Sequence, residues 1–127
     1  MPKVILGSRG SLLALAQTHE TRDRLIAAFP ELGAPGAIGI EKITSTGDMV
    51  RDRPLADVGG KGLFIKEVED ALLSGRIDVA IHSMKDMETS VADGTAITAV
   101  LPREDPRDAF VSPHVSAIEE LPMGARF

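Results

Sequence analysis

The chain contains no cysteine, tryptophan or tyrosine among its 127 residues. Without cysteine it has no disulfide, no thiolate metal site and no thiol nucleophile. Without Trp and Tyr it lacks the usual stacking platforms for single-stranded nucleic acid. Basic charge is also scarce, since 14 Lys and Arg stand against 19 Asp and Glu and give a net charge of −5. A nucleic-acid binder needs a basic surface to displace counterions from phosphates, so the composition excludes that class of partner.

Long apolar runs are missing as well. No segment approaches the roughly 18 residues that a membrane span needs, and the N-terminus shows no apolar core of a signal peptide. With 43% hydrophobic and 26% charged residues, the composition is that of a globular protein with enough chain for one core. The sequence therefore predicts a cytoplasmic protein without a membrane partner.

Short apolar runs alternate with segments of helical periodicity. The apolar runs predict strands at residues 4–6, 38–43, 78–81 and 96–101. The periodic segments predict helices at about 11–29 and 62–75, with Ser11 as N-cap, Pro30 as the stop of the first helix and Gly75 at the C′ position of the second. In the first helix the apolar residues, Leu12 and Phe29 among them, fall largely on one side. Strands alternating with helices predict an α/β domain over residues 1–102, with a mixed, mainly parallel sheet and flanking helices.

Two further stretches follow no such pattern. Residues 44–61 are too rich in Gly, Asp and Arg to pack, and loops that long are usually lids or disordered, so 45–61 is predicted to be poorly ordered. A short apolar run at 109–111 and a capping-box spacing of Ser116 and Glu119 predict another strand and the start of a helix. We assign 103–127 to a hinge and the opening of a second, incomplete domain. The ending at Phe127 is typical of a chain cut as a strand begins; the alternative is a natural short protein with Phe127 docked.

Polar residues gather directly after two of the predicted strands, where open α/β sheets bind ligands. Residues 8–11 place Arg9 at a helix N-terminus, which favours an anion, although a Ser N-cap with a nearby Arg is most often only a cap. After the strand at 78–81, Asp86 stands beside Lys85 and could stabilise a developing cation. His82 is more often structural in such a place, and no second ligand lies at metal-binding spacing from it, so no metal site is predicted.

Two more charged segments can be interpreted either as part of a ligand site or as solvated surface. Glycines surround Lys61 at a predicted helix start, which permits close approach to an anion, but a hinge with a solvated lysine fits equally well. Residues 103–108 include five charged side chains, and a solvated turn with local ion pairs is the simpler interpretation. Together these residues predict a cleft rimmed by Arg and Lys around one carboxylate. Such a cleft suits a small ligand that has several carboxylates and a cationic or N–H group.

Five segments resemble, in order, the N-terminal blocks of porphobilinogen deaminases (hydroxymethylbilane synthases): residues 8–14, 44–48, 54–64, 82–86 and 103–110. The strings H-S-M-K-D, G-G-K-G-L-F and R-E-D-P-R-D-A-F are highly specific together. The resemblance implies a monomeric, three-domain enzyme in which two domains resemble those of periplasmic binding proteins. It also implies the joining of four porphobilinogen units, with loss of ammonia, to hydroxymethylbilane in tetrapyrrole and haem biosynthesis. A dipyrromethane cofactor is implied too, tethered to a cysteine that this chain lacks.

The resemblance also implies roles for single residues. It makes Asp86 the catalytic residue, which holds pyrrole N–H groups and stabilises the cation formed as ammonia leaves. Residues implied to bind cofactor or substrate are Arg9, Ser11 and Lys85, which grip acetate and propionate groups, Gln17 and Ser83, which line the same cleft, and Lys61, which lies in a mobile active-site cover.

The chain departs from the family pattern at three places. Gly10 replaces the usual glutamine, Asp57 replaces a frequent lysine, and Met87-Glu88 replaces a common Val-Pro. These could also mark a degenerate paralogue. The resemblance covers roughly the first two-fifths of the family, so this chain alone is expected to be inactive. The alternative function is a stand-alone module of binding-protein-like fold that captures a small carboxylate without chemistry.

Overall fold

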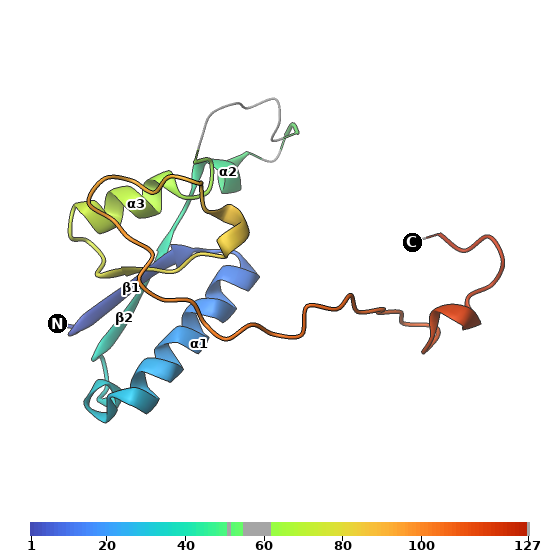
Figure 1. The fold of residues 1–127 in the computed structure, drawn as a ribbon, viewed down its shortest axis with the longest axis horizontal. Helices are drawn as coiled ribbons and strands as arrows, with labels where there is room; N and C mark the ends of the chain where they lie inside the picture. Colours follow the sequence, from blue (N-terminus) through green and yellow to red (C-terminus); the bar gives the residue numbers. More distant parts are fainter. Residues whose placement is uncertain (51, 55–61, 127) are drawn as a thin grey trace.

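The computed structural model describes residues 1–50, 52–54 and 62–126 (Figure 1). Its strands are β1 (Val4–Arg9), β2 (Ile38–Ile43) and β3 (Val79–Ala80). Its α-helices are α1 (Leu12–Ala28), α2 (Thr46–Met49) and α3 (Lys66–Leu73), and single 3₁₀ turns occur at Pro30–Gly33, Met84–Asp86 and Ile118–Glu120. None of the helices within these residues combines the length and apolar character that crossing a membrane requires.

The three described strands form one parallel sheet in the order β2-β1-β3. On one side of β1, Val4 pairs with Ile38 of β2, and on the other side Leu6 pairs with Val79 of β3, so β1 is the central strand. Because parallel crossovers are right-handed, α1 and α3 cover opposite faces of the sheet (Figure 1). The predicted α/β class with a mainly parallel sheet is confirmed. The chain places β2 on one side of β1 and β3 on the other. The carboxyl end of β1 is therefore a topological switch point, where such sheets bind ligands.

The helix ends follow the sequence signals. The Ser11 hydroxyl accepts a hydrogen bond from the Ala14 N–H at 3.2 Å, which satisfies one of the free donors at the start of α1. Phe29 is the C-cap of α1, directly before Pro30. After α3, Gly75 adopts a φ of 73°, and its N–H donates to the Leu72 carbonyl at 3.1 Å. All three predicted signals are confirmed.

A small core lies between α3 and the sheet. It contains Ile43, Val68, Ala71 and Ile77, all at most 5% exposed. Val68 and Ala71 thus form the inner face of α3. The apolar side of α1 is buried only in part. Leu12 is 90% exposed, Leu15, Leu25 and Ile26 are half-buried, and Thr18 is the one fully buried residue of this helix.

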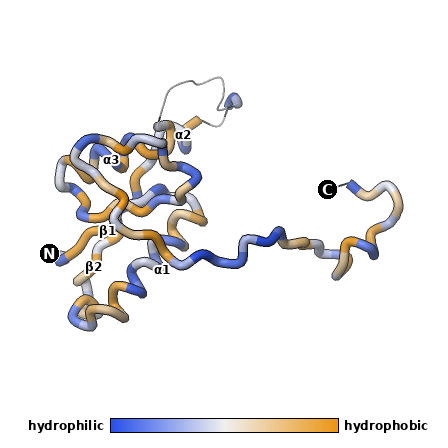
Figure 2. The backbone as a smooth tube through the Cα atoms, viewed as in Figure 1, coloured by the Kyte–Doolittle hydropathy of each residue, from blue (hydrophilic) through white to orange (hydrophobic). Residues whose placement is uncertain are grey.

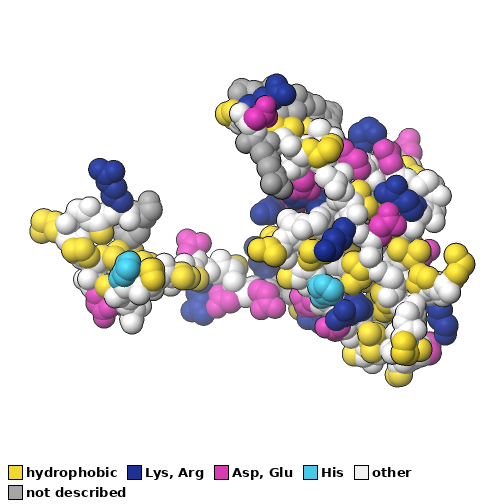
Figure 3. All heavy atoms as spheres, turned by 180° about the vertical axis from the view of Figure 1, so that it is seen from behind, with side chains coloured by type: hydrophobic (Ala, Val, Ile, Leu, Met, Phe, Trp, Pro, Cys, Tyr) yellow, Lys and Arg dark blue, Asp and Glu magenta, His cyan; other side chains and the backbone are white. Residues whose placement is uncertain are grey.

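The C-terminal predictions need correction. No strand forms at 96–101 or 109–111; residues 96–110 are all exposed and leave the domain as an extended arm (Figures 1 and 2). A strand needs a hydrogen-bonded neighbour, and the adjacent edge strand β3 has only two residues. The helix expected from Ser116 is a single 3₁₀ turn, and Glu120, not Glu119, accepts from the Ser116 N–H at 3.0 Å. Figure 3 shows charged side chains interrupting the hydrophobic ones along this arm.

The prediction that 45–61 is poorly ordered is wrong for its first part. Residues 46–49 form α2, Ser45 is fully buried, and the Gly47 N–H donates to the Leu63 carbonyl at 2.7 Å. The polar residues pack because they satisfy one another and the adjacent backbone, a possibility that composition alone does not reveal. Asp57 and Lys61 lie outside the described residues, and their predicted roles stay predictions.

Candidate functional site

A pocket of about 300 Å³ opens at the carboxyl ends of β1 and β3. The residues after β1 and the start of α1 form one wall, and the residues after β3 form the other. Its polar lining comprises Arg9, Ser11, His82, Ser83, Lys85 and Asp86, and its apolar lining comprises Leu13, Ala14, Phe64 and Ile81. The two stretches singled out from the sequence are thus brought together at the switch point of the sheet.

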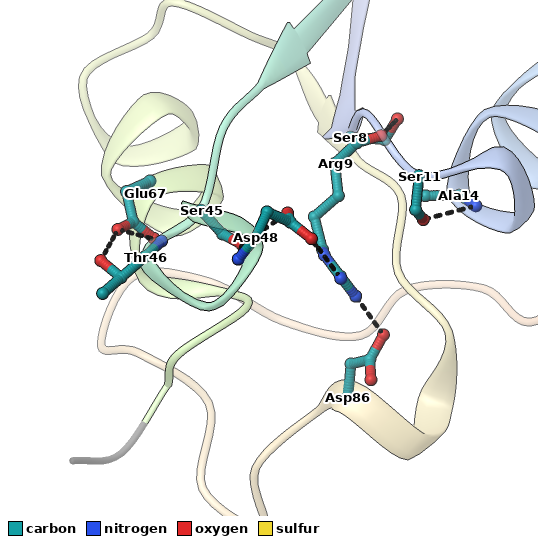
Figure 4. Close-up of polar contacts among 9 residues, drawn as sticks. All are labelled: Ser8, Arg9, Ser11, Ala14, Ser45, Thr46, Asp48, Glu67 and Asp86. Carbon is teal, nitrogen blue, oxygen red and sulfur yellow. Dashed lines mark hydrogen bonds and ion pairs between the residues drawn. The ribbon is translucent and has the colours of Figure 1, made fainter. Parts of the chain in front are cut away.

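Arg9, the last residue of β1, connects three elements (Figure 4). Its Nε and Nη2 donate to the two carboxylate oxygens of Asp48 in α2, at 3.0 and 2.6 Å. Its Nη1 donates to Asp86 Oδ2 at 3.1 Å. The hydrogen bond to Asp48 raises the pKa of Arg9, and the same bond lowers the pKa of Asp48. Asp48 and Arg9 are therefore an ionised pair with two parallel hydrogen bonds, the strongest geometry for these groups.

The aromatic ring of Phe64 packs against the guanidinium of Arg9. Arg9 Cζ lies 4.2 Å from the centroid of the Phe64 ring, within the range of a cation–π contact. Phe64 in turn lies against Gly47, where a Cβ would come within 2.4 Å of the ring. The glycine of α2 thus allows α2, Phe64 and Arg9 to pack in one layer.

Asp86 closes the short 3₁₀ turn that follows β3. Its N–H donates to the Ser83 carbonyl at 3.0 Å, and its side chain is 19% exposed while held by Arg9. Neighbouring Lys85 lines the pocket from an exposed position. The turn therefore presents one half-buried carboxylate and one solvated ammonium to the same space.

A hydrogen bond joins the two walls of the pocket. The Ser83 hydroxyl donates to Gln17 Oε1 at 2.8 Å, which ties the turn after β3 to α1. Six of the seven residues predicted to form the site thus lie in or beside this pocket: Arg9, Ser11, Gln17, Ser83, Lys85 and Asp86. The seventh, Lys61, lies outside the described residues.

Sequence reasoning missed Asp48 and Phe64 as parts of the site. Asp48 stands three residues after Ser45, which is the spacing of a capping pair, and the structure has this cap: Ser45 Oγ accepts from the Asp48 N–H at 3.2 Å. That signal predicts a helix start within 44–61. It does not predict that the Asp48 carboxylate reaches Arg9, 39 residues earlier in the chain.

His82 lines the pocket with both ring nitrogens buried and without a hydrogen-bond partner among the described residues. Burial lowers the pKa of His82, because removal from water disfavours the imidazolium. The charge of Asp86 acts in the opposite direction, and that of Arg9 in the same direction as burial. The pocket therefore holds a neutral imidazole next to an ion-pair cluster.

The lowered pKa of His82 makes the stability of the chain depend on pH. Below about pH 6.5, the ordinary pKa of His, the unfolded chain takes up a proton that the folded chain resists. The free energy of unfolding is therefore expected to fall as pH falls through 6.5, and His82→Gln should reduce this part of the dependence. Urea unfolding between pH 7.5 and 5.5 measures it, with exposed His114→Gln as the matched control. Equal slopes for the parent and His82→Gln would contradict the assignment.

The arrangement combines an acceptor with donors around one small space. Asp86 can accept N–H groups or stand beside a cation, while Lys85 and the Ser11 hydroxyl can bind carboxylates. Within the described residues no cluster of three or more His, Asp or Glu has the geometry of a metal site. A parallel α/β sheet with a polar pocket at its switch point is the arrangement of α/β domains that bind small molecules.

Comparisons with known proteins narrow this class to one family. The family model described as the dipyromethane cofactor binding domain of porphobilinogen deaminase matches residues 4–127. A chloroplastic porphobilinogen deaminase from Oryza sativa subsp. japonica is 59% identical over 94% of this chain, and the match covers 34% of that relative. The porphobilinogen deaminases of Paracoccus denitrificans and Nitrobacter winogradskyi are 60% and 57% identical over 94% of the chain, and the matches cover 38% and 37% of them. The chain belongs to the porphobilinogen deaminase family and spans little more than a third of the length of these relatives.

Proposed function

We propose that the protein containing this chain is a hydroxymethylbilane synthase. It joins four porphobilinogen molecules into hydroxymethylbilane and releases one ammonia with each addition. The observation that carries this proposal is the Asp86 carboxylate, held in a pocket of mixed polarity by Arg9 at 3.1 Å. Family membership supports this enzyme over the stand-alone carboxylate-binding module.

Asp86 is the proposed catalytic residue. Its carboxylate accepts pyrrole N–H groups and stabilises the positive charge that develops as ammonia leaves the aminomethyl carbon. A half-buried carboxylate is more effective in this role than a solvated one, because fewer water dipoles screen its charge. Its backbone is fixed by the turn that begins at Ser83, so its position is set before the ligand binds.

The carboxylate groups of the substrate are assigned to the pocket rim. Lys85 is exposed beside Asp86, and Ser11 offers its hydroxyl from the start of α1. Gln17 orients Ser83 through their hydrogen bond. Arg9 is proposed to bind substrate carboxylates with its remaining N–H groups, since its Nε and Nη2 already donate to Asp48. Lys61 is proposed to cover the site from the preceding segment.

The residues present fit a dipyrromethane cofactor. Such a group carries N–H donors and several carboxylates, and the pocket offers one carboxylate acceptor together with cationic and hydroxyl donors. Asp86 would hold its N–H groups, and Arg9, Ser11 and Lys85 would hold its carboxylates. Ser83 and Gln17 would line the same space. The cofactor supplies the terminal pyrrole to which the first substrate is added. Since this chain has no cysteine, the thiol that tethers the cofactor belongs to another part of the protein.

The wider organisation is part of the same proposal. Residues 1–102 belong to a first domain resembling half of a periplasmic binding protein, and 103–127 lead into a second domain that closes the cleft. The exposed arm at 96–110 supports this division, because its apolar side chains lack partners among the described residues. A monomer in the cytoplasm remains the expected state, although one relative is named as chloroplastic.

The direct test is an assay of the complete protein with porphobilinogen. The product is oxidised to uroporphyrin and measured by absorbance, and steady formation is the expected result. The 127-residue chain alone, purified in parallel, should give no product because it has no thiol for the cofactor. A complete protein that folds yet does not consume porphobilinogen would refute the proposed function, and turnover by the chain alone would refute its dependence on the thiol.

A further inference from the structure

The guanidinium of Arg9 lies between two carboxylates, and Figure 4 shows one on each side. Asp48 binds it through two hydrogen bonds of 3.0 and 2.6 Å, and Asp86 through one of 3.1 Å. The three side chains are only 15 to 24% exposed. Two carboxylates and one guanidinium leave this cluster with one net negative charge. Lys85 lines the same pocket from an exposed position, so the balancing positive charge lies in solvent while the half-buried part of the site is negative.

We propose that Asp48 is a positioning residue that keeps the negative charge of Asp86 available to a cationic ligand. It does so by balancing the charge of Arg9 from the opposite side. Arg9 can then orient Asp86 through a single hydrogen bond without neutralising it. The ligand class that this arrangement favours is a small molecule with a positive charge beside N–H donors.

Asp48 is itself held in place from two directions. The Ser45 hydroxyl, fully buried, donates to Asp48 Oδ2 at 2.6 Å and accepts from the Asp48 N–H. The hydrogen bond from Arg9 lowers the pKa of Asp48, so the carboxylate is ionised at neutral pH. Because Ser45 holds both the backbone and the side chain of Asp48, its carboxylate is a fixed acceptor that orients the guanidinium of Arg9.

The hydrogen bonds of Arg9 show what the loss of Asp48 would do. A guanidinium has five N–H donors; Asp48 takes those on Nε and one on Nη2, and Asp86 takes one on Nη1. With asparagine at position 48, the positive charge of Arg9 has Asp86 as its nearest carboxylate, 3.1 Å away. The Phe64 ring, 4.2 Å from Arg9 Cζ, contacts the guanidinium without taking a hydrogen bond from it. Arg9 then pairs more fully with Asp86 and cancels the charge that a cation needs.

The binding test uses two small probes on the complete protein. 2-(Aminomethyl)pyrrole is a cation at neutral pH, and 2-(hydroxymethyl)pyrrole is its neutral counterpart of similar shape. Asp48→Asn is expected to weaken the cationic probe about fivefold or more, on the scale of one partly screened charge, and to leave the neutral probe within about twofold. Asp48→Glu, which keeps the charge, should retain most of the preference. Asp23→Asn removes an exposed carboxylate of α1 and is the matched control.

The turnover test adds a second readout and rests on the proposed function. Under single-turnover conditions with saturating porphobilinogen, Asp48→Asn should slow the reaction about tenfold or more, with little change in the half-saturating concentration. Unchanged probe binding in Asp48→Asn would overturn the inference. So would equal weakening of both probes, since that is the result of a purely structural role. If the parent shows no turnover, the proposed function fails, while the probe comparison still reports on Asp48.

Discussion

Replacing Asp86 with asparagine in the complete protein is expected to lower turnover by about 10²–10³-fold, the scale for loss of one preorganised charge-stabilising group. Asparagine nearly preserves the shape and still hydrogen-bonds, but it lacks the charge that a developing cation needs. Folding should be little affected, because Arg9 keeps its two hydrogen bonds to Asp48. Asp86→Glu should retain more activity than Asp86→Asn, since the charge survives a shift of one methylene.

Single-turnover kinetics on cofactor-loaded preparations measure this loss without interference from product release. Asp70→Asn is the matched control, because Asp70 is an exposed carboxylate on α3 that pairs only with Lys66 among the described residues, at 2.8 Å. Its turnover should stay within about twofold of the parent. If Asp86→Asn reacts within threefold of the parent, Asp86 is structural and the catalytic assignment is wrong.

A second large effect is expected at Gly7, in the middle of the central strand. Gly7 is buried and pairs with Glu41 on one side and Ala80 on the other. A Cβ there would come within 2.3 Å of Ile77 Cδ1, and Ile77 is itself only 1% exposed. Gly7→Ala should therefore lower the free energy of unfolding by about 1–3 kcal/mol, the usual cost of overpacking a core.

Gly10→Ala is the control for this substitution, because it lies three residues away and is exposed with open space around its Cα. Alanine there restricts only the unfolded chain, so the variant should be neutral or up to about 1 kcal/mol more stable. Urea unfolding of both variants and the parent gives the comparison. A Gly7→Ala protein as stable as the parent would show that Ile77 moves aside without cost.

Much of the fold could be predicted because its signals are local. The apolar run at 38–43 and the caps at Ser11 and Gly75 act within one turn or strand, and each is found as predicted. The strand at 96–101 failed because an apolar run specifies only a tendency to be buried, while a strand also needs a neighbour. The apolar side of α1 is buried only in part for a related reason, since periodicity shows which residues share a side and not what covers it.

The site was predictable in outline for another reason. Parallel strands bring their carboxyl ends to one edge, so Arg9 after β1 and Asp86 after β3 had to lie near each other once the sheet order was set. The second carboxylate bound by Arg9 was not predictable, because Asp48 lies in a four-residue helix inside a stretch whose composition indicates a loop. Phe64 could not be predicted as part of the site either, because only its packing against Gly47 and Arg9 places it there.

The position of β1 in the middle of the sheet has a consequence for synthesis on the ribosome. Of these three strands β1 is made before both of its neighbours, because Leu6 pairs with Val79 and Val4 with Ile38. At about 5–20 residues per second, the interval between the synthesis of β1 and that of β3 is roughly 4–15 s. During that time β1 has at least one open hydrogen-bonding edge, the one that β3 later covers. Nascent chains of this protein are therefore expected to bind chaperones through β1 until β3 has left the exit tunnel.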